Sequence, residues 1–361
     1  MKKALVFMIL IFITAVYLVG KIKHTKTVSQ EKNSILRKTE PTKKTAQSIL
    51  KQKTSIFVPY WAIGQDEIST IPFDTIYYFG IAVHKKGIDE NEAGYQNLER
   101  MICPNDKKCI LVLRMLDAGV NKVILEDNVL QKQIMRDSME LVETYSFSGI
   151  ALDLEQVNLF DTDLTKRINI FVQSYYTELH KANKTLSTIV YGDAYYRKRP
   201  FDIKSMGGSS DEVMIMAYDF HKNYSEPGPN FPFDRKSLTS TDYGYDFKQM
   251  IKDFTASVPS ERITVIFGMY GYDWTLNNQG TPLKRGEAVT VNQIKKLTNS
   301  AIQIINKSQI PNSKEKKIEY EDGEGQKHVI WYEDEESVAV KINYLKEQGI
   351  GSVSYWAYGY F

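Results

Sequence analysis

From about residue 54 onward, short hydrophobic runs alternate with stretches whose apolar residues recur at helical spacing. Short runs rich in β-branched and aromatic side chains are typical of buried strands. Eight of them lie at residues 56–61, 75–82, 109–114, 148–155, 185–191, 213–219, 263–268 and 351–356. Amphipathic helices are clearest at residues 130–145, 164–179 and 336–348. Eight strands that alternate with helices predict an α/β fold, a (β/α)8 TIM barrel over residues 54–361.

Residues 277–335 interrupt this alternation between the seventh strand and the last helix. The segment is too long for a simple loop, and it includes a polar stretch at residues 314–327. We therefore expect additional structure to be inserted into the barrel at this point.

The first 53 residues differ in character from the rest. An apolar run from Ala4 to Gly20 is flanked by lysines, and its length is at the lower limit for spanning a bilayer. It also fits a secretory signal peptide, but no small-x-small cleavage site is obvious after it. We therefore favour an uncleaved membrane anchor at residues 1–20, followed by a basic flexible linker at residues 21–53. Either interpretation predicts an extracytoplasmic body, anchored to the membrane or secreted.

Charge is distributed unevenly along the chain. Residues 1–53 carry twelve Lys and Arg against Glu31 and Glu40, about +10, so the total of +2 leaves about −8 for the remainder. An acidic body argues against nucleic acid as the main partner.

Two cysteines, Cys103 and Cys109, are separated by five residues. The spacing permits a disulfide that closes a small loop in an exported protein, and it equally permits two free thiols.

Two carboxylates end the fourth predicted strand. In a strand over residues 148–155 side chains alternate between faces, so Asp153 and Glu155 share the face of the small residues Gly149 and Ala151. Two residues of rise separate the acids by about 6.5–7 Å. Like charges at this distance push their pKa values apart, so one can remain protonated as an acid while the other is ionised.

This stretch resembles the signature D-G-x-D-x-D-x-E of glycoside hydrolase family 18, the chitinase-like enzymes. Gly149, Asp153 and Glu155 match the signature, whereas Ser148 and Ala151 stand where the family usually has Asp.

Further motifs follow in the family's order. Residues 216–219 (M-A-Y-D) match its M-x-Y-D motif, and Trp356 ends the eighth strand, where the family places a Trp under the sugar. Residues 270–274 (Y-G-Y-D-W), assigned to the end of the seventh strand, and residues 331–334 (W-Y-E-D) resemble the branch with bacterial spore-cortex and cell-wall hydrolases. The resemblance covers roughly residues 54–361, and it implies that the inserted segment is a small α+β subdomain beside the substrate groove.

Carried over residue by residue, the resemblance implies substrate-assisted, retaining cleavage of β-linked N-acetylated amino sugars, as in peptidoglycan or chitin. In this scheme Glu155 protonates the leaving oxygen, and Asp153 holds the acetamido N–H while the acetamido carbonyl attacks the anomeric carbon. Tyr218 and Asp219 position the acetamido group, and Trp356 forms the floor under the sugar. Other predicted substrate contacts are Met216, Tyr60, Trp274 and Tyr272. No metal or organic cofactor is required, and we expect a monomer with a polysaccharide as its partner.

Ala151 is the main departure from the family pattern. The family's Asp at this position pairs with the carboxylate at position 153, so we expect reduced or pH-shifted activity here. Two alternatives stay open: a non-catalytic, lectin-like barrel that binds the same glycans, and a wall-anchored scaffold with an occluded cleft. Retention of Glu155 together with Asp153 favours an enzyme, and predicted export favours a bacterial cell-wall substrate over chitin.

Overall fold

The computed structural model describes residues 52–64, 68–235, 242–300 and 303–361. The predicted anchor at residues 1–20 and all but the end of the predicted linker lie outside these ranges. Within them, no helix combines the length and the apolar character needed to cross a membrane.

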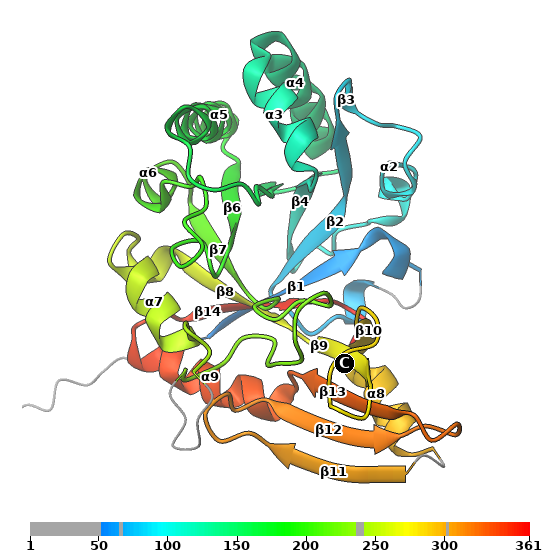
Figure 1. The fold of residues 1–361 in the computed structure, drawn as a ribbon. Coiled ribbons are helices and arrows are strands. Elements are labelled where there is room, and N and C mark those ends of the chain that lie inside the picture. The colour runs from blue at the N-terminus through cyan, green and yellow to red at the C-terminus, as the bar shows by residue number, and fades with distance from the viewer. Residues whose placement is uncertain (1–51, 65–67, 236–241, 301–302) are drawn as a thin grey trace, which may run out of the picture. The chain divides into compact units, whose positions relative to one another are not determined.

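Eight parallel strands close into a barrel, which confirms the predicted architecture (Figure 1). Closure occurs where the first strand pairs in parallel with the second on one side and with the last on the other. The barrel strands are β1 (Lys53–Pro59), β2 (Thr75–His84), β4 (Lys108–Met115), β5 (Gly149–Leu154), β6 (Thr185–Tyr191), β7 (Glu212–Ala217), β8 (Ile263–Gly268) and β14 (Ser352–Trp356). A two-residue strand, β3 (Gly87–Ile88), extends the end of β2 in antiparallel fashion.

Helices surround the barrel, and most begin at an aspartate. They are α2 (Ala93–Gln96), α3 (Ala118–Glu126), α4 (Asn128–Thr144), α5 (Thr162–Lys181), α6 (Ile203–Gly208), α7 (Phe247–Thr255) and α9 (Glu335–Glu347). The side chains of Asp117, Asp127, Asp161, Asp202, Asp246 and Asp334 accept backbone N–H groups in the first turns of α3 to α7 and α9. Each cap satisfies otherwise unpaired donors and contributes about 1 kcal/mol.

The insertion is a five-stranded antiparallel sheet with one helix, on one side of the barrel in Figure 1. Its elements are β9 (Tyr270–Leu276), β10 (Glu287–Thr290), α8 (Val291–Thr298), β11 (Gln303–Gln309), β12 (Lys316–Glu321) and β13 (Lys327–Tyr332). It therefore begins at Tyr270, earlier than predicted, and residues 270–274 do not end the seventh barrel strand. The chain leaves the barrel at Gly268, and β9 then pairs with β13 of the inserted sheet instead of continuing the barrel strand.

The two cysteines form a disulfide. Cys103 precedes β4 and Cys109 is its second residue, with 5.9 Å between their Cα atoms. Of the two alternatives left open by the sequence, the structure has the cross-linked one.

Register within the barrel brings charged side chains to one end of the inner face. Arg114 on β4 pairs with Asp153 on β5, two residues further toward the C-terminal rim than the fully buried Ala151. At the opposite end, the carboxylate of Glu212 accepts hydrogen bonds from the hydroxyls of Tyr77 (2.5 Å) and Ser187 (2.7 Å). Buried side chains lie between the two polar layers, and the C-terminal rim combines acids with an exposed aromatic residue, Trp61.

Candidate active site

Glu155 is the first residue after β5, and its backbone is held on both sides. Its N–H donates to the carbonyl oxygen of Met115 (2.8 Å), and its own carbonyl accepts from the side-chain amide of Asn121 (2.9 Å). Asn121 is fully buried and also donates to the Met115 carbonyl (2.7 Å). Because the backbone is fixed in this way, the carboxylate of Glu155 is placed at the barrel rim with only its side-chain torsions free.

The carboxylate of Glu155 has a protein partner and a raised pKa. The hydroxyl of Tyr191, at the end of β6, donates a hydrogen bond to its Oε2 (2.5 Å). Burial raises the pKa of Glu155, while the hydrogen bond from Tyr191 and the positive charge of Lys222 oppose that rise. A carboxyl group whose pKa is raised in this way is better suited to act as a general acid than one with the ordinary pKa.

Asp153 is buried beside Glu155. It is 5% exposed, and its Oδ1 has no hydrogen-bond partner among the described residues. Burial raises the pKa of Asp153 well above its ordinary value and the negative charge of Glu155 adds to this, whereas Arg114 lowers it. The Arg114 guanidinium lies over the rings of Tyr60 (5.1 Å) and Phe79 (5.2 Å). An unpaired, buried carboxyl oxygen at the rim is available to a ligand.

Asp219 follows β7 in a left-handed conformation, with φ at 59°. The hydroxyls of Tyr270 and Tyr272 both donate to its Oδ1, the latter at 2.7 Å. Its N–H donates to the side-chain oxygen of Asn230 (2.7 Å). Few non-glycine residues adopt this backbone conformation, and here three hydrogen bonds from surrounding elements maintain it.

Tyr218 joins these acids into one electrostatic cluster. Burial raises the pKa of Tyr218 well above its ordinary value, and the charges of Asp153, Asp219 and Glu155 raise it further. Met216, two residues earlier on β7, is buried in the barrel interior and pairs in register with Tyr191. The structure therefore brings together the four side chains predicted to be catalytic, with Met216 among their neighbours.

Aromatic rings form one wall of the rim. Trp356 is half-buried at the end of β14, with its ring edge-on to Phe79 (4.6 Å between centroids) and 6.4 Å from Trp61. Trp61 is 47% exposed and packs edge-on against Tyr60 in the short 3₁₀ turn Tyr60–Ala62. The sequence placed Trp61 within the first strand; in the structure it lies just beyond the strand and extends the surface of Trp356.

One predicted substrate contact is wrong. Trp274 is fully buried in the insertion, packed against Tyr272, and cannot contact a sugar in this structure. It lies in the hydrophobic cluster of the inserted sheet together with Val329 and Trp331. Tyr272 is 8% exposed, and its hydroxyl reaches the site through Asp219.

Sequence reasoning missed several residues that contact the acids. Tyr191 and Arg114 end the predicted fifth and third strands, and the rule that rim residues follow strand ends would have identified both. Asn230 has no such signal, because it lies in a loop well after its strand.

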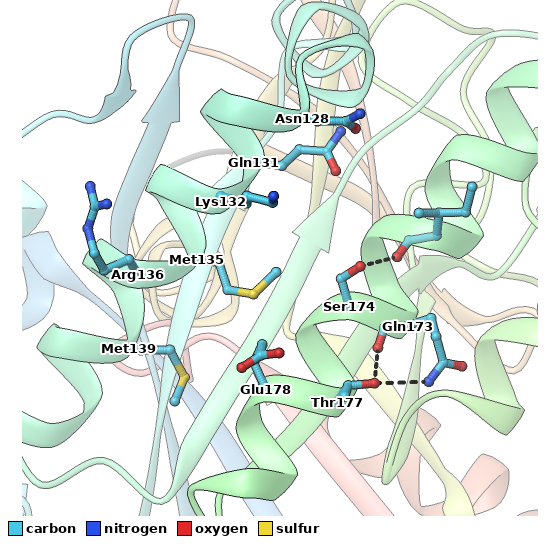
Figure 2. A pocket seen from close by; sticks show the side chains of 11 residues that line it. Asn128, Gln131, Lys132, Met135, Arg136, Met139, Gln173, Ser174, Thr177 and Glu178 are labelled. Carbon is cyan, nitrogen blue, oxygen red and sulfur yellow. Dashed lines mark hydrogen bonds between the residues drawn. The ribbon is translucent and has the colours of Figure 1, made fainter.

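A cavity of about 810 Å³ lies elsewhere, between α4 and α5 on the outer ring of helices (Figure 2). Met135 and Met139 of α4 and Gln173 and Thr177 of α5 are among the residues that line it. None of the predicted site residues borders it, so cavity size does not locate the cluster of acids.

Known proteins share this fold and sequence pattern. The sequence profile of the glycosyl hydrolases family 18 matches residues 119–360. The cortical fragment-lytic enzyme of Bacillus anthracis is 25% identical over 300 residues, covering 80% of this chain and 65% of that protein. The human di-N-acetylchitobiase is 23% identical over 288 residues, covering 73% of this chain and 70% of that protein.

Solved structures agree on the fold. The Bacillus cereus spore cortex-lytic enzyme SleL aligns with a TM-score of 0.69 at 22% identity, covering 87% of this chain and 72% of that chain. The chain spans 65%, 53% and 52% of the lengths of three bacterial relatives that it matches. With its profile matched over most of the barrel, the chain belongs to glycosyl hydrolase family 18.

Proposed function

We propose that this protein is an extracytoplasmic glycoside hydrolase that cleaves β-linked N-acetylated amino sugars by substrate-assisted, retaining catalysis. The observation that carries the proposal is the carboxyl group of Glu155, fixed at the rim with a raised pKa beside Asp153, Tyr218 and Asp219. A binding surface has no need of an acid whose pKa is raised by burial, whereas general acid catalysis of glycosidic cleavage uses one.

In the first step, Glu155 gives its proton to the glycosidic oxygen as the bond to the anomeric carbon breaks. The acetamido carbonyl oxygen of the same sugar attacks that carbon from the opposite face and forms a cyclic oxazolinium ion. Asp153, with its unpartnered Oδ1, accepts the acetamido N–H and stabilises the positive charge that develops there.

In the second step, the carboxylate of Glu155 removes a proton from water, which attacks the anomeric carbon and reopens the ring. Two inversions at this carbon retain its configuration. Tyr218 donates to the acetamido oxygen, and Asp219 fixes this group, since its own carboxylate is held by Tyr270 and Tyr272. Trp356 supports the apolar face of the sugar, and Trp61 offers a second platform beside it.

We propose a peptidoglycan-type glycan as the substrate. Support comes from the bacterial relatives, named as cortical fragment-lytic enzymes, while chitin oligosaccharides share the same acetamido chemistry. The apolar run at residues 4–20 supports a membrane-anchored or secreted protein, and we propose that it acts as a monomer.

The test compares the wild type with Glu155→Gln on purified peptidoglycan and on chitin oligosaccharides from pH 4 to pH 8. Products are identified by mass, and the anomer formed first is identified by NMR. We expect N-acetylated fragments with retained configuration, and a loss of about 10²–10⁴-fold in the variant, because general acid catalysis contributes that much. Glu143→Gln, an exposed residue of α4, is the matched control and should retain activity. Binding without cleavage by the wild type would instead establish the lectin-like alternative.

A further inference from the structure

Tyr191 makes the hydrogen bond to the proposed acid. It is the last residue of β6, it is 8% exposed, and its hydroxyl donates to Oε2 of Glu155 at 2.5 Å. Burial and the neighbouring charge of Glu155 raise the pKa of Tyr191 far above its ordinary value. The phenol therefore stays protonated from pH 4 to pH 8, and it is the donor in this pair.

The ring of Tyr191 is itself held by a buried ion pair. The Arg199 guanidinium carbon lies 4.1 Å from the ring centroid. Both oxygens of Asp193 accept from Arg199, at 2.8 Å from Nε and 3.2 Å from Nη2. Arg199 and Asp193 are 7% and 4% exposed, so neither side chain is free to move away. The Lys222 ammonium lies 5.6 Å from the same ring centroid. Cations over an aromatic face are attracted to it and polarise the phenol into a better donor.

This arrangement decides which oxygen of Glu155 carries the acidic proton. Oε2 already accepts a hydrogen from Tyr191, so the proton of the carboxylic acid resides on Oε1. When that proton leaves for the glycosidic oxygen, negative charge develops on the carboxylate and the bond from Tyr191 strengthens. An interaction that strengthens as the proton leaves accelerates the step.

Position 151 supplies no carboxylate to this site. A carboxylate two residues before Asp153 is absent, and the alanine in its place is fully buried between Val112 of β4 and Ser187 of β6. We infer that Tyr191, held in place by Arg199 and Asp193, is the residue that positions and tunes the acid Glu155 in this protein. This inference rests on the proposed function.

The first experiment measures the pH profile of kcat/KM for the full chain and for Tyr191→Phe, which keeps the ring and removes the hydroxyl. Loss of a hydrogen bond to a charged group should lower kcat/KM roughly 10- to 100-fold. The basic limb should also move to higher pH by about one to two pH units, since the carboxylate loses stabilisation. The loss should be smaller on a nitrophenyl glycoside, because that leaving group needs little protonation. A purely structural role of Tyr191 predicts equal losses of kcat/KM on both substrates and no shift in the basic limb of the pH profile.

Tyr195→Phe is the matched control. Tyr195 lies four residues away, and its hydroxyl donates to Ser257 (2.7 Å) rather than to the acid. Arg199→Lys keeps the charge but loses the bidentate contact with Asp193. We expect the same loss of kcat/KM and the same shift of the basic limb as in Tyr191→Phe, both smaller in size. An equal shift in Tyr195→Phe, or an unmoved limb in Tyr191→Phe, would overturn the inference.

A second measurement does not depend on turnover. Carbodiimide reacts with the protonated carboxyl, so its rate of modification of Glu155 against pH, followed by peptide mass mapping, reports when that group titrates. We expect the Tyr191→Phe midpoint at higher pH than that of the wild type, and coincident midpoints would refute the role of Tyr191. If the midpoints differ but the wild type cleaves no glycan, the role of Tyr191 stands and the proposed function fails.

Discussion

Removal of the Lys341 side chain should strongly destabilise this protein. Its side chain is fully buried in α9, where Nζ donates to the carbonyl oxygen of Phe231 (2.7 Å) and to Oε1 of Glu333 (2.7 Å). Oε1 of Glu315 lies 3.3 Å away. Glu315 in turn accepts the backbone N–H groups of Phe231 (2.7 Å) and Asn230 (2.5 Å). One ammonium group thus joins the barrel helix, the insertion and the loop after β7.

Replacement by Met keeps the length of the side chain and removes the charge. Two carboxyl groups, both fully buried, would then face each other without a cation. Removing one partner of a buried ion pair costs about 3–5 kcal/mol, because the remaining charge is left uncompensated. Domains unfold with roughly 5–15 kcal/mol in total, so Lys341→Met should lose a large share of its stability.

The loss should depend on pH in a defined direction. Burial raises the pKa of Glu333 from 4.5 to about 8, although the charge of Lys341 lowers it. The folded state therefore holds this proton more tightly than the unfolded state. Its contribution is complete below about pH 4.5 and is lost as the pH rises through 8, by at most about 5 kcal/mol. Without Lys341 the pKa of Glu333 rises further, so the variant should be relatively less destabilised at pH 5 than at pH 8.

Urea unfolding at pH 5, 6, 7 and 8, followed by circular dichroism, measures these differences. Glu333→Gln removes the titrating group but keeps an oxygen for Lys341, so its stability should vary less with pH than that of the wild type. Lys346→Met, on the exposed face of the same helix, should change stability by no more than about 0.5 kcal/mol. A cost below about 1 kcal/mol for Lys341→Met at pH 7, with an unchanged denaturant slope, would refute the reasoning.

Three further outcomes follow from the site and its surroundings. Asp153→Asn should lower kcat on chitin oligosaccharides by about 10²–10³-fold with little change in KM, because the substitution removes a charge that is needed only in the transition state. Steady-state kinetics test this prediction, and a change confined to KM would contradict it. Trp61→Ala should raise KM several-fold and leave kcat nearly unchanged, and a product assay at varied glycan concentration tests it. Reduction of the Cys103–Cys109 disulfide should cost about 2 kcal/mol, as expected for a closed loop of this size, and urea unfolding with and without reductant measures it.

The barrel was predictable because its signals are local. The hydrophobic pattern of each strand and helix can be recognised within about ten to twenty residues, and the two acids are neighbours on one face of the predicted strand. The bond between Tyr191 and Glu155 joins residues 36 apart and depends on strand register, which no local pattern gives. The burial of Trp274 escapes local prediction for the same reason: its strand β9 belongs to the inserted sheet, and its hydrophobic cluster includes Val329 and Trp331, more than 50 residues further along the chain.

The buried cluster around Lys341 has one local sign in the sequence. In α9 the buried positions are Ser337, Val338, Lys341 and Leu345, which follow a helical stripe, so a lysine interrupts the face that packs inward. Burial of a lysine requires a carboxylate nearby, and this rule alone predicts a partner. It does not predict which one, since Glu315 lies 26 residues away, in the insertion.

These contacts link the insertion to the proposed catalytic residues. Glu315 holds the backbone N–H of Asn230, and Asn230 accepts from the N–H of Asp219 while its amide donates to the carbonyl of Tyr270 (3.2 Å). The hydroxyl of Tyr270 in turn donates a hydrogen bond to the carboxylate of Asp219. The left-handed backbone of Asp219 is thus fixed from three directions, and two of them originate in the inserted segment. A barrel without this insertion could keep Glu155 in place but would leave Asp219 free to adopt ordinary backbone angles, and the acetamido group of the substrate would lose the side chain that we propose positions it.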